Sequence, residues 1–64
     1  MKVRIKSFNG ELPSYLTEGK EYEVVDWYGI ANKNPIITDD FGDEIAIVLL
    51  KSSHLNGGSW EIVE

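Results

Sequence analysis

Four acidic residues lie close together in the middle of this chain, in the segment Asp39-Asp40-Phe41-Gly42-Asp43-Glu44. Carboxylate oxygens are the ligands that Ca²⁺ prefers in proteins. The spacing does not match the alternating acidic pattern of an EF-hand loop, however, and a solvent-exposed hairpin turn accounts for the cluster without a metal. We therefore predict no metal site here, and no cofactor.

The single histidine, His54, follows two serines, Ser52 and Ser53, and the chain has no cysteine. A hydrolytic site needs a nucleophile, a base and an orienting group held at hydrogen-bond distance, which neighbours in one tight turn rarely achieve. A paired-carboxylate site needs a cleft, and a small domain whose interior is filled by side chains has no room for one. We predict that the chain is not an enzyme and that His54 caps a turn or lies on the surface.

Aromatic side chains near the ends of the expected strands are the stronger candidates for function. Tyr15 lies in a long loop, Trp27 and Tyr28 end a strand, and Phe41 lies at a hairpin turn with no evident part in a core. Large, stiff rings are effective anchors in protein interfaces. The sequence predicts that Tyr15, Trp27 and Tyr28 converge into a partner-binding patch, with Phe41 as a further contact. The alternative for Trp27, as for Trp60, is that it fills the core.

Length and charge narrow the class of protein. The chain has 64 residues, a net charge of −5, 42% hydrophobic residues and seven aromatics. We expect one domain over residues 1–64, with one compact core. The charge argues against a nucleic-acid footprint or a polybasic membrane patch, and no apolar run approaches the ~20 residues that span a bilayer. The N-terminus shows no signal-peptide pattern. We expect a cytoplasmic protein that binds neither nucleic acid nor membrane.

The pattern of apolar and β-branched residues indicates five short strands and no long helix. We place them near residues 2–8, 20–28, 35–39, 43–50 and 59–63. The pairs Asn9-Gly10 and Asn56-Gly57 are turn signals, and residues 51–55 suit one 3₁₀ turn. The expected core comprises Val3, Ile5, Leu16, Tyr22, Val24, Ile37, Ile45, Ile47 and Ile62. The fold class is therefore all-β, a barrel or sandwich.

The order of these pieces resembles a small five-stranded SH3-like barrel with one 3₁₀ turn before the last strand. The segment Leu16-Thr17-Glu18-Gly19-Lys20-Glu21-Tyr22-Glu23-Val24 resembles the diverging turn that opens the second strand of that fold. More narrowly, the chain is similar to small SH3-like barrel proteins of bacteria and phages or prophages, of the YorP type. The residues with which SH3 domains grip proline-rich peptides do not match, because the third strand opens with Pro35-Ile36. The resemblance implies a fold and a phage or prophage accessory role, not an activity.

The function that fits these observations is that of a small, non-catalytic protein-binding module. One alternative is an acidic decoy that occupies the nucleic-acid-binding surface of a partner. Another is a structural homo-oligomer, for instance a homodimer formed through the strand 45–50, which is apolar on both faces. A direct nucleic-acid binder using Lys2, Arg4 and Lys6 is less favoured, since we expect these cations to face glutamates on neighbouring strands.

Overall fold

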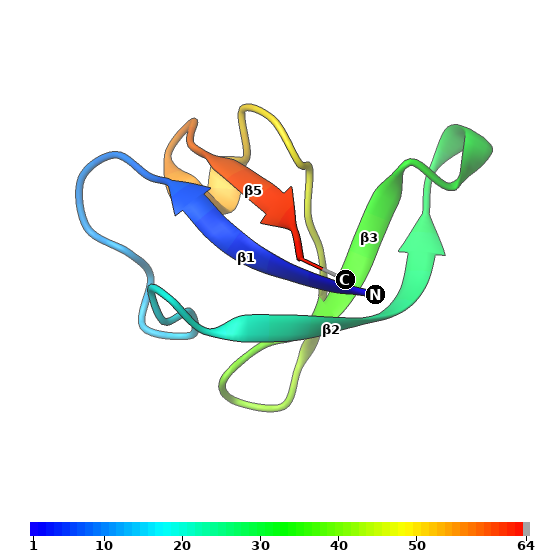
Figure 1. Ribbon diagram of the computed structural model, residues 1–64, viewed down its shortest axis with the longest axis horizontal. Helices are drawn as coiled ribbons and strands as arrows, with labels where there is room; N and C mark the ends of the chain where they lie inside the picture. Colours follow the sequence, from blue (N-terminus) through cyan, green and yellow to red (C-terminus); the bar gives the residue numbers. More distant parts are fainter. Residues whose placement is uncertain (64) are drawn as a thin grey trace.

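The computed structural model describes residues 1–63, and within them the fold is all-β. Five antiparallel strands form one sheet in the order β4-β3-β2-β1-β5 (Figure 1). The strands are β1 (Lys2–Ser7), β2 (Glu21–Tyr28), β3 (Asn34–Thr38), β4 (Glu44–Ala46) and β5 (Ser59–Ile62). The two helical segments are single 3₁₀ turns, η1 (Ile30–Asn32) and η2 (Ser53–Leu55). The all-β class is confirmed, as is the 3₁₀ turn before the last strand, whereas η1 was not expected.

Strand β1 lies between β2 and β5. Its apolar and charged residues alternate, so one face of the strand is buried and the other is not. Val3 and Ile5 are buried, and the intervening Arg4 lies on the opposite face. Val3 pairs with Tyr22 of β2 and with Ile62 of β5. The sheet register therefore brings the apolar residues of three strands onto one face.

A β-bulge interrupts β2 at Val25. Val24 pairs with Ile37 of β3, but the next pair joins Asp26 to Ile36, so β2 carries one extra residue. A single inserted residue reverses which side chains point inward beyond it. Trp27 therefore pairs with the buried Pro35 and is half-buried, instead of sharing the outer face with Val25.

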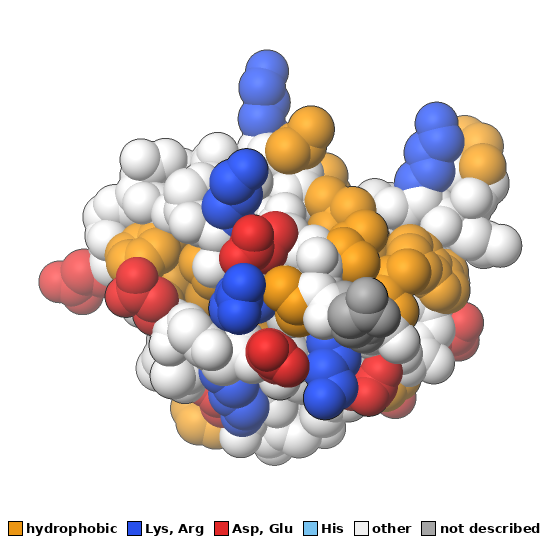
Figure 2. Space-filling view, viewed as in Figure 1, with side chains coloured by type: hydrophobic (Ala, Val, Ile, Leu, Met, Phe, Trp, Pro, Cys, Tyr) orange, Lys and Arg blue, Asp and Glu red, His pale blue; other side chains and the backbone are white. Residues whose placement is uncertain are grey.

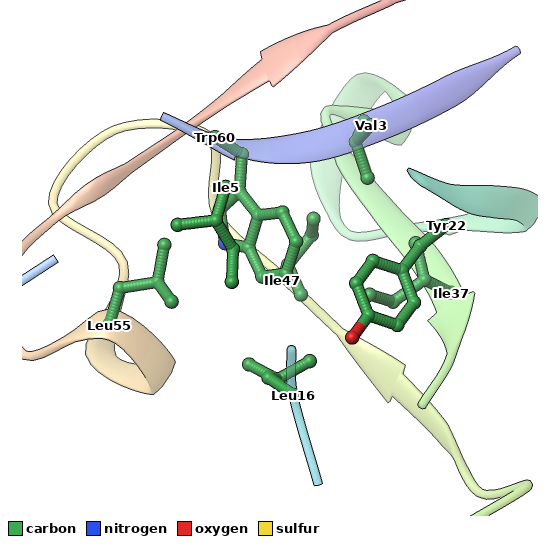
Figure 3. Packing of buried hydrophobic residues seen from close by; sticks show 8 residues of the cluster. All are labelled: Val3, Ile5, Leu16, Tyr22, Ile37, Ile47, Leu55 and Trp60. Carbon is green, nitrogen blue, oxygen red and sulfur yellow. The ribbon is translucent and has the colours of Figure 1, made fainter. Parts of the chain in front are cut away.

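The core lies within the curl of the sheet, where Figure 3 shows side chains from all parts of the chain turned toward one another. Eight hydrophobic residues form it: Val3, Ile5, Leu16, Tyr22, Ile37, Ile47, Leu55 and Trp60. The rings of Tyr22 and Trp60 meet edge to face, with centroids 6.0 Å apart. Six of the nine expected core residues are confirmed as buried, and Val24 and Ile45 are half-buried against this cluster.

The expectation for Ile62 was wrong, because it is 52% exposed. Ile62 is the last residue of β5, which is an edge strand of the described sheet. Trp60, two residues earlier, contributes the buried side chain of that strand, and its indole N–H donates to Ser52 Oγ at 3.1 Å.

The fourth strand is shorter than the predicted 43–50. After Ala46 only the Ile47 N–H continues the ladder, by donating to the Pro35 carbonyl, and the chain then bends at residues 49–51. Lys51 has a φ of 54°, a left-handed conformation that ends extended structure. At the start of the bend the Leu49 carbonyl accepts the Trp60 N–H at 2.8 Å, so this part of the chain runs beside β5. The strands β4 and β5 are the two edge strands of the described sheet and do not pair with each other.

Candidate functional site

The structure does not bring the predicted aromatic patch together. Tyr15 lies in the loop before β2, whereas Tyr28 is the last residue of that strand. An eight-residue strand is about 23 Å long at ~3.3 Å per residue, and Figure 1 shows the two loops at opposite ends of β2. Phe41 lies on the Tyr15 side, because the Asp40 N–H donates to the Tyr15 carbonyl at 3.0 Å. Tyr15 and Tyr28 therefore belong to different surfaces.

Tyr15 is half-buried and holds His54. Its hydroxyl lies 2.9 Å from His54 Nδ1, and the two rings meet edge to face with centroids 5.9 Å apart. His54 Nε2 lies 3.2 Å from the Ala46 carbonyl, which only accepts, so we assign the imidazole proton to Nε2 and the Tyr15 hydroxyl as donor to Nδ1. His54 is thus neither a turn cap nor a free surface residue. It joins the first loop to the edge of β4.

The serines beside His54 do not form a catalytic pair with it. Ser52 is fully buried, and its hydroxyl accepts the indole N–H of Trp60. The Ser52 backbone pairs with Gly58, which turns the chain back toward β5. Gly58 itself has no room for a side chain, because a Cβ there would collide with the Ser7 carbonyl oxygen. This turn serves close packing.

The acidic segment is organised around two carboxylates that bind protein groups. Asp39 is buried, and its Oδ1 accepts the N–H groups of Phe41 and Asp43, each at 2.9 Å. This is the local pattern by which aspartate fixes a turn. The side chain of Phe41, at the tip of this turn, is 67% exposed. No group of three or more potential metal ligands occurs within residues 1–63.

Asp40 ties the same turn to the beginning of β2. Its carboxylate accepts from Thr17 Oγ1 and Lys20 Nζ, both at 2.6 Å, and from the Tyr22 hydroxyl at 3.0 Å. The hydrogen bond from Lys20, followed by that from Thr17, lowers the pKa of Asp40 below its ordinary value. The bond to Asp40 in turn raises the pKa of Lys20, while burial is the main cause of the raised pKa of Tyr22. The Lys20 ammonium also lies 5.1 Å from the Tyr22 ring centroid.

The connection between β2 and β3 differs in character. Tyr28 is 63% exposed and Ile30, in η1, is 92% exposed. Gly29, Ala31 and Asn32 all have positive φ, and the one backbone hydrogen bond that closes this turn runs from the Asn32 N–H to the Gly29 carbonyl at 3.1 Å. Figure 2 shows hydrophobic and basic side chains together on the projection at upper right, where Figure 1 places this connection. Ile30 is a candidate that sequence reasoning missed.

Two of the three basic residues of β1, Lys2 and Arg4, are paired with glutamates as predicted, whereas Lys6 is exposed and forms no ion pair within residues 1–63. Arg4 lies 2.9 Å from a carboxylate oxygen of Glu61 and 3.8 Å from one of Glu21, and Lys2 lies 3.9 Å from Glu21. These side chains are partly exposed, so each pair contributes little to stability. In Figure 2 charges of both signs are interspersed on the face in view.

Two further findings bear on the class of protein. Within residues 1–63 no helix is long and apolar enough to cross a membrane. Comparisons of the chain with protein-family models, with curated proteins and with solved structures found no match in any of the three.

Proposed function

We propose that this chain is a small, non-catalytic module that binds another protein through the β2–β3 connection. The observation that carries the proposal is the exposure of Ile30 and Tyr28 on one projecting turn. An exposed aliphatic side chain and an exposed aromatic side chain, two residues apart in the chain, are typical of the centre of a protein interface. Tyr28 was among the predicted contacts, and Ile30 replaces Tyr15 as its neighbour.

The non-catalytic part of the proposal is supported by what the polar candidates already bind. Asp39 and Asp40 accept hydrogen bonds from the backbone and from neighbouring side chains. Ser52 and His54 are likewise engaged, with Trp60, Tyr15 and the Ala46 carbonyl. Within residues 1–63 none of these contacts joins a serine hydroxyl to His54, which is the pairing that a hydrolytic nucleophile and its base would need.

We also propose that the fold is an SH3-like barrel, as the resemblance in the sequence implies. The strand order supports this, because β1 lies between β5 and the central strand β2, and the hairpin of β3 and β4 follows on from β2. The Trp60–Leu49 hydrogen bond and the Ser52–Gly58 bridge support it further, since they lead the chain after β4 back to β5. A phage or prophage accessory role belongs to the same proposal.

The experiment is an affinity capture from the host that encodes the chain, with wild type and two variants compared by quantitative mass spectrometry. Tyr28→Ala and Ile30→Ser are expected to lose the captured partner. Ile62→Ser is the matched control, because Ile62 is 52% exposed but lies in β5, outside both candidate interfaces. A partner that both variants retain would place the interface elsewhere, with the Phe41 turn as the next site to test.

A homodimer through residues 45–50 is a second candidate, favoured by the alternation in this segment. Ile47 is fully buried, whereas Val48 and Leu50 are exposed. The outward residues form an apolar strip that the described fold does not use. Analytical ultracentrifugation of wild type and of Leu50→Ser distinguishes this from hetero-association, because only the homodimer makes the wild-type mass depend on concentration.

A further inference from the structure

Two Asn-Gly pairs, far apart in sequence, contact one another in this fold. Asn9-Gly10 follows β1, and Asn56-Gly57 follows η2. Asn9 Nδ2 donates to the Asn56 carbonyl at 3.1 Å, and Asn56 Nδ2 donates to the Asn9 carbonyl at 2.7 Å. We call this reciprocal pair of hydrogen bonds the asparagine clasp. It fastens the first loop to the turn before β5.

Asparagine followed by glycine is the pair most prone to spontaneous deamidation, since glycine has no Cβ to hinder its nitrogen. The glycine N–H loses its proton, and the nitrogen attacks the asparagine Cγ. The Cγ–Nδ2 bond breaks, and nitrogen leaves as ammonia after taking up a proton, so a five-membered succinimide remains. Water then opens the ring at either carbonyl to give aspartate or isoaspartate. No oxidant, reductant or cofactor is required.

The fold holds the reacting atoms of Asn56 more firmly than those of Asn9. The attacking nitrogen would be that of Gly57, whose N–H donates to the carbonyl of the buried Ser52 at 2.8 Å. The leaving group, Asn56 Nδ2, donates both to the Asn9 carbonyl and to the Glu11 carbonyl, the latter at 3.3 Å. Both partners in the reaction must therefore give up hydrogen bonds before it begins.

Asn9 and Gly10 are held by fewer hydrogen bonds than Asn56 and Gly57. Asn9 Nδ2 makes the single clasp bond, and within residues 1–63 the Gly10 N–H makes no hydrogen bond. Asn9 and Gly10 are both exposed, so hydroxide and water reach them. The Gly10 nitrogen can therefore attack the Asn9 side chain in the folded state without first giving up a hydrogen bond.

We propose that Asn9 and Asn56 are an ordered pair of deamidation sites, in which Asn9 reacts first and its modification then exposes Asn56. The first reaction replaces the Asn9 donor by a carboxylate that faces the Asn56 carbonyl, so two acceptors meet and the clasp opens. In an isoaspartate the main chain runs through the former Cβ and Cγ, so the Asn9 carbonyl that Asn56 Nδ2 binds leaves the main chain and becomes part of a free carboxylate. Asn56 is then held by fewer bonds than before.

The test follows the folded protein in mildly alkaline buffer by peptide mapping, with isoaspartate detected through enzymatic methyl esterification. We expect Asn9 to react at least about fivefold faster than Asn56, the factor that one hydrogen bond of ~1 kcal/mol supplies. Asn32 and Asn34, which precede Lys33 and Pro35, are slow internal controls in the same sample. Equal rates at the two Asn-Gly sites, or an earlier reaction at Asn56, would overturn the proposal.

Two further arms test whether the fold imposes the order. In concentrated urea the two sites should react at similar rates, and persistence of the native ratio there would show that local sequence sets it. Asn9→Asp reproduces the first product and should accelerate Asn56 severalfold over wild type. Asn9→Gln, which keeps an amide donor, should accelerate it less. If Asn9→Asp leaves the Asn56 rate unchanged, the second step of the proposal is wrong.

Discussion

The two connections that flank β3 differ in how firmly they are held. Residues 39–43 lead into β4, and their turn is closed by the Asp39 carboxylate and fastened to β2 by Asp40. Residues 29–33 lead into β3, and one backbone hydrogen bond closes their turn. The first has the residues that look like a site, a cluster of carboxylates. The second contains the exposed Ile30 and follows directly on the exposed Tyr28.

The difference teaches that chemically suggestive residues can be fully engaged in folding. The carboxylates of Asp39 and Asp40 accept hydrogen bonds from N–H and O–H groups of the fold. In the 29–33 turn the exposed apolar area of Ile30 has no structural use that the described contacts reveal. Function is therefore to be sought where the fold leaves apolar area in water, not where the charges cluster.

Within the two turns, the largest effect is expected for Asp39→Ala. The substitution leaves the N–H groups of Phe41 and Asp43 without their acceptor, and should lower the free energy of unfolding by about 2 kcal/mol. Urea denaturation at neutral pH measures the change. Asp43→Ala is the matched control, since Asp43 is exposed, and should stay within ~0.5 kcal/mol. Equal effects of the two substitutions would show that the Asp39 carboxylate does not hold the turn.

The second test uses pH to release the bond between Lys20 and Asp40. The pKa of Asp40 is lowered in the fold, so its stabilisation is complete above the ordinary value of 3.8 and is lost as the pH falls through the lowered pKa. The free energies of unfolding of wild type and Asp40→Asn should therefore differ at neutral pH and converge in strong acid. A difference that stays constant down to strong acid would contradict the proposed source of the pKa shift.

In alkaline solution the free energy of unfolding falls as the pH rises, which is the opposite of its pH dependence in acid. The pKa of Lys20 is raised above its ordinary 10.5, so its contribution is complete below that value and is lost as the pH rises through the raised pKa. The raised pKa of Tyr22 acts in the same direction above its ordinary 10.0. Lys20→Met should therefore show a flatter alkaline limb than wild type, with the Tyr22 contribution left in both.

The third test exchanges glycine and alanine between the two turns. Gly42 has a φ of 87°, and a Cβ added there would meet no atom within 4 Å, so Gly42→Ala meets only backbone strain and should cost about 1 kcal/mol. Ala31 already carries that strain at a φ of 60°, so Ala31→Gly should stabilise by ~0.5 kcal/mol. Thermal unfolding compares the pair. Destabilisation by Ala31→Gly would mean that the Ala31 side chain packs in a way that the described contacts do not reveal.

Much of the fold could be predicted because apolar and polar residues visibly alternate along parts of the sequence. Val3 and Ile5 alternate with charged residues, and their burial follows directly. The bulge at Val25 could not be predicted, because one inserted residue leaves no mark in composition and yet reverses the orientation of Trp27. The bend after Ala46 was missed for a related reason, since Ile45 to Leu50 is uniformly apolar and gives no signal that the chain leaves the ladder.

The candidate site was less accessible to sequence reasoning. Tyr28 was singled out correctly as a residue at a strand end, and it is exposed. Its expected convergence with Tyr15 depends on which end of β2 each loop occupies, and the two loops lie at opposite ends. Ile30 carried one usable signal, an isolated apolar residue directly after a glycine in a polar turn.

The smallest effect is expected at Ile30, and it is the most informative for function. Ile30 in η1 and Ile37 in β3 are the same residue type, but their side chains are 92% and 0% exposed. Ile37→Ala should cost ~2–5 kcal/mol, whereas Ile30→Ala removes area that is already in water and should change the free energy of unfolding by less than ~0.5 kcal/mol. Urea denaturation of both variants measures the contrast. If Ile30→Ala costs more than ~1 kcal/mol, the turn packs against the domain in solution, and any loss of binding by Ile30→Ser would reflect the fold. If it costs nothing, such a loss places Ile30 in the interface.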